Sequence, residues 1–125
     1  MTGAARLFFT LAIGYFIAGV IVGLYMAIGE DRSQIVAHAH IMLAGWVSSA
    51  LFAFFYHAFP AISVSGLARG HFWLQAVSGI VMVISLLFLF GGVTAAEPGA
   101  AAGAIGFGLG VLLFAYISLK EIWKA

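Results

Sequence analysis

Two histidines, His38 and His40, stand two positions apart in the apolar stretch VAHAHIMLAGW. Successive residues of an α-helix advance by about 100°, so two residues at this spacing point about 200° apart. The pair is therefore poorly placed to grip one ion together, but it can serve two sites on opposite flanks of one helix. An ionisable side chain inside an apolar span indicates a functional site, although a neutral imidazole can also simply hydrogen-bond to a neighbouring helix.

The ligand that best suits a lone imidazole on a helix flank is haem iron. Zinc requires three or four ligands, whereas haem takes one or two axial histidines and its other ligands from the porphyrin. The chain has no cysteine, which excludes covalent c-type attachment and thiolate metal sites. The neighbouring residues leave room for a flat apolar group: Ala37, Ala39, Ala44 and Gly45, with Trp46 close by. The pattern favours b-type haem, with His38 and His40 as iron ligands.

Three further residues are candidates for the same site. Met42 lies one helical turn after His38, and Trp46 follows one turn later. Arg32 precedes the histidines on the same side of the membrane and is either a partner for the haem propionates or a solvated loop charge. Both interpretations of Arg32 stay open at this point.

The remaining histidines and methionines favour structural roles. His57 and His71 flank the segment PAISVSGLARG, which we expect at the membrane interface. Met26 and Met82 are expected to fill the core.

The elements that must position these residues are transmembrane helices. Of 125 residues, 65% are hydrophobic and 7% are charged, which is too apolar for a small soluble domain. Four runs reach the roughly 20 residues that a membrane span needs. The sequence predicts an all-α membrane protein, a single four-helix bundle over residues 1–125, with helices at about 7–28, 35–59, 71–91 and 100–119.

Charge placement predicts how the bundle is oriented. Only Arg32 is basic between the first and second helices, whereas the other basic residues fall on the opposite side: Arg6, Arg69, Lys120 and Lys124. The positive-inside rule therefore places both termini in the cytoplasm. The net charge of +1 provides no basic face for nucleic acid, and the expected surroundings are membrane lipid.

Small residues recur at a spacing that lets helices approach closely. Gly19 and Gly23 form one such pair, and the last helix carries two more, 99 with 103 and 106 with 110. These glycines favour packing between helices of one chain, with packing between subunits as the alternative.

The stretch from Val36 to Gly79 resembles the tenth and eleventh helices of haem–copper oxidase subunit I. In that family one helix opens with VAHxH and ends with HxFP, and the next opens with HF, followed by a glycine. The matching positions are Val36, Ala37, His38, His40, His57, Phe59, Pro60, His71, Phe72 and Gly79. The resemblance implies that His38 and His40 bind two different haems on opposite flanks, and it suggests a bacterial inner membrane.

The departures from that family are as informative. The chain corresponds to one of the three four-helix arcs in a twelve-helix subunit I. It lacks the helix that supplies the second histidine of the low-spin haem, and it lacks the helices that hold copper and the nearby tyrosine. A single chain therefore cannot carry out the family's complete oxidase chemistry.

Three copies of the chain would replace the three arcs as a homotrimer that mimics the twelve-helix subunit I. Each interface would then clamp one haem b between His38 of one protomer and His40 of its neighbour, giving one haem per chain. With both axial positions filled, electron transfer with a quinol or cytochrome partner is favoured over catalysis. The alternatives are oxygen or nitric oxide chemistry at an opened ligand position, or a non-haem transport or assembly subunit.

Overall fold

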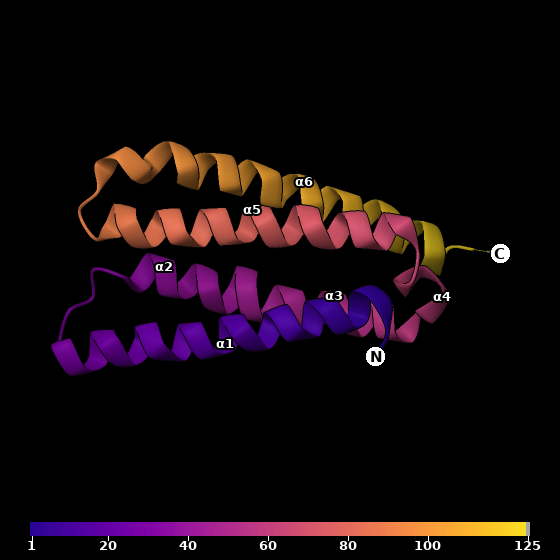
Figure 1. Cartoon of the computed structure of the whole chain (residues 1–125), viewed down its shortest axis with the longest axis horizontal. Coiled ribbons are helices and arrows are strands. Elements are labelled where there is room, and N and C mark those ends of the chain that lie inside the picture. Colours follow the sequence, from indigo (N-terminus) through magenta and orange to yellow (C-terminus); the bar gives the residue numbers. More distant parts are fainter. Residues whose placement is uncertain (125) are drawn as a thin grey trace.

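The computed structural model describes residues 1–124 as two helical hairpins that lie side by side (Figure 1). The first hairpin pairs α1 with a second span in three parts, and the second pairs α5 with α6. The elements are α1 (Gly3–Gly29), α2 (Ile35–His40), the π-helix η1 (Ile41–Val47), α3 (Ser48–Ala58), α4 (Pro60–Ser63), α5 (Gly66–Phe90), the 3₁₀-helix η2 (Thr94–Ala96) and α6 (Glu97–Ile122).

Among residues 1–124, four stretches are long and apolar enough to cross a membrane: Gly3–Gly29, Ile35–Ala58, Gly66–Phe90 and Thr94–Ile122. At about 1.5 Å per residue each exceeds the ~30 Å hydrocarbon layer of a bilayer. Most large apolar side chains on the outer faces of these helices are exposed, as lipid contact requires. The chain is therefore an all-α integral membrane protein, as the sequence predicts.

Local capping explains where the helices begin and end. Glu30 closes α1 in the left-handed conformation, with φ of 52°, and its N–H donates to Met26. The third span begins at Gly66 rather than near His71, because the Ser65 hydroxyl accepts the N–H of Ala68 at 3.1 Å and caps the helix. The last helix likewise begins before residue 100, because a proline is tolerated in its first turn.

The second span contains a π-helical segment that the sequence does not predict. The α-helix that carries both histidines ends at His40, and η1 continues the span to Val47 before α3 resumes. Gly45 lies inside this segment, where the Tyr15 ring occupies the space of a side chain: a Cβ at Gly45 would meet Tyr15 carbons at 2.5 Å. Such segments concentrate at functional sites.

A glycine seam joins α5 to α6. Each glycine of α6 on this face accommodates an α5 residue where its own side chain would be: Gly99 with Ser85, Gly103 with Met82, Gly106 with Ser78, and Gly110 with Gln75. The two glycines of α1 also leave space for side chains of the second span: Met42 packs against Gly19, and His38 packs against Gly23. In residues 1–124 the small-residue pairs thus pack helices of one chain together.

Both termini lie at one end of the bundle (Figure 1), and this end has an aromatic core around His71. His71 is fully buried, and its Nδ1 shares a hydrogen bond with the Tyr56 hydroxyl at 2.9 Å. Phe8, Phe52 and Phe114 surround its ring. His71 thus lies in the core of the bundle near the start of α5, where its contacts fit the expected structural role, and its interfacial depth stays a prediction.

Candidate functional site

His38 lies in the second turn of the second span and faces α1. Its Nδ1 is 3.0 Å from the carbonyl oxygen of Gly19, and its ring lies over Gly23. A Cβ at Gly23 would approach the His38 Cε1 to 3.1 Å, so the absence of a side chain there makes room for the imidazole. Two α1 glycines thus fix both the position and the orientation of this ring.

His40 is oriented by its own helix. Its Nδ1 lies 2.8 Å from the carbonyl oxygen of Val36, one turn earlier. The side chain is partly exposed, as is that of His38. Each of the two rings is therefore held by a backbone carbonyl.

These two contacts determine which ring nitrogen is available. A carbonyl oxygen only accepts hydrogen bonds, so in both residues Nδ1 carries the hydrogen and donates it. The Nε2 atom of each neutral imidazole then keeps its lone pair free for a ligand. Metal-binding histidines typically donate their other ring N–H to a backbone carbonyl or a carboxylate in this way.

The two histidines open onto separate pockets. His38 lines one of about 310 Å³, and Arg32 lines the same pocket from the preceding loop. His40 lines a smaller one of about 140 Å³ with Ala39, Leu43 and Ala44. The pockets share no residue, which agrees with the opposite flanks that the i, i+2 spacing predicts.

The His38 pocket brings Arg32 into the candidate site. The only ion pair within residues 1–124 joins Lys124 to Glu121, so Arg32 is not paired with the acidic residues beside it in the loop. Met26 also lines this pocket, although the sequence indicated a core role for it. An unpaired guanidinium, a thioether and an imidazole therefore face one apolar recess.

Met42 and Trp46 lie elsewhere. The Met42 sulfur packs onto Gly19, and Trp46 stacks on Phe16 with ring centroids 4.6 Å apart. Neither residue lines the pocket of His38 or that of His40. A part for them in cofactor binding stays a prediction that these contacts do not support.

The site provides single ligands and not clusters. Among residues 1–124, no group of three or more histidine, aspartate or glutamate side chains lies close enough to hold a metal ion. His57 is exposed near the opposite end of the span and does not meet either histidine of the pair.

Gly19 and Gly23 are site residues that the sequence reasoning treated only as packing residues. Their GxxxG spacing indicates a close approach of helices, but it does not predict which side chain packs against the glycines. That became visible only when the structure placed His38 over Gly23 and its Nδ1 beside the Gly19 carbonyl.

Comparison with known proteins finds a distant similarity to an oxidase subunit. The chain is 32% identical over 88 residues to the cytochrome c oxidase polypeptide 1 of Halobacterium salinarum. The match covers 62% of this chain, and it spans only 15% of that relative's length. No protein-family model matches the chain, and no solved structure matches it. The similarity fits a relationship to subunit I of the haem–copper oxidases.

Proposed function

We propose that the protein is a b-type haem membrane cytochrome whose histidines, His38 and His40, bind iron at the interfaces of a homotrimer. The observation that carries the proposal is that the two rings are held in the same way. In each, the Nδ1 hydrogen is donated to a carbonyl oxygen and Nε2 is left free, and each ring lines its own surface pocket. Bound haem would supply a reversible one-electron carrier in an apolar environment.

The geometry of a single chain supports the trimer. Each pocket offers one imidazole, and the two pockets are separate, so one chain presents two half-sites. A ring in which the His38 surface of one protomer meets the His40 surface of the next completes every half-site. Three copies close such a ring with twelve spans, the number in the subunit I that the sequence resembles.

The other residues of the His38 pocket have defined tasks in this proposal. Arg32 lies at the membrane surface without a carboxylate partner in residues 1–124, and its guanidinium suits the carboxylates of a haem edge. Gly19 and Gly23 fix the His38 ring, with Nδ1 on the Gly19 carbonyl and the ring against Gly23. With both axial positions filled, the role is electron transfer with a quinol or cytochrome partner.

The test is the haem content of the purified protein and of single histidine variants. We expect about one haem b per chain, measured as pyridine haemochrome, and a sharp low-spin band on reduction. His38→Ala and His40→Ala should each lose nearly all bound haem, because each removes one ligand from every interface.

His57→Ala is the matched control, because His57 is exposed and lies outside both pockets. It should keep the wild-type haem content. A wild-type protein that stays colourless with haem supplied contradicts the haem proposal. Full haem content in either the His38 or the His40 variant contradicts the shared site.

A further inference from the structure

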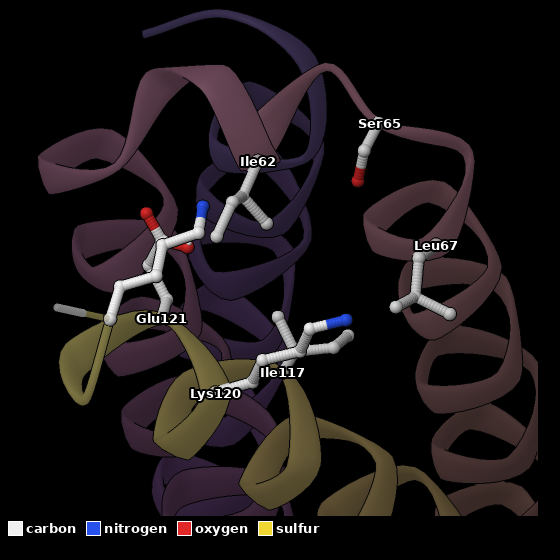
Figure 2. Close-up of a pocket in the computed structure, with 7 residues that line it drawn as sticks. Ile62, Ser65, Leu67, Ile117, Lys120 and Glu121 are labelled. Carbon is white, nitrogen blue, oxygen red and sulfur yellow. Dashed lines mark ion pairs between the residues drawn. The ribbon is translucent and has the colours of Figure 1, made fainter.

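Another pocket lies at the end of the bundle that holds both termini, far from the histidine pair, and Figure 2 shows residues that line it. Its volume is about 210 Å³. Apolar walls come from Ile62, Leu67 and Ile117, which belong to three different helices. The pocket thus lies where α4, the start of α5 and the end of α6 meet.

Polar groups gather around the same pocket. Figure 2 shows the Lys120 side chain extending from α6 toward the side where Leu67 and Ser65 lie. Glu121 and Lys124 also line the pocket and form an ion pair at 2.8 Å. Because this pair neutralises itself, Lys120 leaves the pocket with a net positive charge within residues 1–124.

The whole end of the bundle is electropositive. Apart from Glu121, its charged side chains are all basic: Arg6, Arg69, Lys120 and Lys124. The opposite end carries the other three acidic side chains and one basic side chain. An anionic group is therefore favoured at this end and disfavoured at the other.

We propose that this pocket binds the headgroup of an anionic phospholipid. The Lys120 ammonium group would contact the lipid phosphate, and the walls of Ile62, Leu67 and Ile117 would contact the first part of an acyl chain. The occupant must be both anionic and apolar, because the basic group and the apolar walls line one recess at the end of the spans. A lipid meets both requirements, whereas free phosphate meets only the first.

The experiment measures lipid binding to the full chain in neutral detergent by native mass spectrometry and thermal unfolding. Phosphatidylglycerol should be retained at one molecule per chain and should raise the unfolding midpoint more than phosphatidylcholine does. Lys120→Gln should weaken phosphatidylglycerol binding about fivefold, the effect of one lysine near an anionic lipid surface. Lys120→Arg keeps the charge and should retain binding.

Arg69→Gln is the matched control, because it removes one exposed positive charge from the same end without touching the pocket. It should leave the affinity within about twofold of wild type. Equal losses in the Gln variants of Lys120 and Arg69 would mean general attraction to the membrane surface and overturn the site. Equal retention of phosphatidylcholine, or equal stabilisation by inorganic phosphate, would also overturn it.

Discussion

At the scale of single residues, two backbone carbonyls determine what the histidines can do. The Gly19 and Val36 carbonyls each accept an Nδ1 hydrogen and so leave both Nε2 atoms free. The sequence predicts the opposite flanks of the two rings from their spacing alone. It does not predict these partners, because the Gly19 carbonyl belongs to another helix that approaches only after the chain has packed.

Gly23→Ala tests the fit of the His38 ring over α1. The added Cβ would lie 3.1 Å from Cε1, so the ring must shift and its contact with the Gly19 carbonyl weakens. We expect the free energy of unfolding in detergent to fall by about 1 kcal/mol, and haem binding to weaken with it.

Gly14→Ala is the matched control on the same helix, because nothing lies within 4 Å of its added Cβ. It should keep the wild-type free energy of unfolding or raise it by about 0.5 kcal/mol, because alanine favours a helix more than glycine does. An equal free energy of unfolding in the Gly23→Ala and Gly14→Ala variants would show that the His38 ring does not pack tightly against Gly23.

Contacts made by other segments of the chain also decide which of the candidates Arg32, Met42 and Trp46 lies beside a histidine. Arg32 shares a pocket with His38, and this favours the interpretation in which it serves the site. Met42 and Trp46 have suitable spacing but pack onto Gly19 and Phe16. Spacing along one helix says which flank a residue occupies, and the neighbouring helix decides whether that flank is open or filled.

At the scale of elements, the four spans were predictable because runs of about 20 apolar residues have few alternatives to a membrane helix. The starts of α5 and α6 were not predictable from hydropathy, because Ser65 and Pro98 act through capping and the first turn. The π-helix was not predictable either. Its apolar residues have no distinguishing pattern, and the Tyr15 ring that packs on Gly45 comes from α1.

Gly103→Ala tests the glycine seam between α5 and α6. A Cβ at this position would meet the backbone of Met82, with its Cα at 2.6 Å, and backbone atoms cannot rotate away. The two helices must separate, so we expect the free energy of unfolding to fall by about 1–3 kcal/mol. Reversible unfolding in mixed detergent micelles measures it.

Gly108→Ala is the control for the seam, since its added Cβ would have no atom within 4 Å. It removes a glycine from the same helix without touching α5, and the protein should stay as stable as wild type. A loss in this variant equal to that of Gly103→Ala would point to an intrinsic effect of glycine in α6 and not to the seam.

At the scale of the whole molecule, the proposed ring makes each site depend on two chains. Co-expressing His38→Ala chains with His40→Ala chains tests this dependence. In randomly mixed trimers about one quarter of the interfaces receive an intact His38 from one chain and an intact His40 from the next. Purification through a tag on each chain leaves only mixed trimers, and each of these has one intact interface out of three. We therefore expect these complexes to bind about a third of the wild-type haem.

Either variant expressed alone should bind almost none, and this sets the baseline for the mixture. A mixture that binds no more haem than that baseline would place both ligands of each haem within one chain, or would show that the chains do not exchange. Recovery through both tags separates these outcomes, because complexes of chains that do not exchange never carry both tags.

The depth of the histidine pair restricts which face of the membrane it can communicate with. The second span begins at Ile35, so His40 lies only about 8 Å along it, with about 25 Å of helix between it and Ala58. Any redox group held there would be near one surface and remote from the other. Electrons would then enter and leave at the same membrane face, and the protein would transfer electrons along that surface and not across the bilayer.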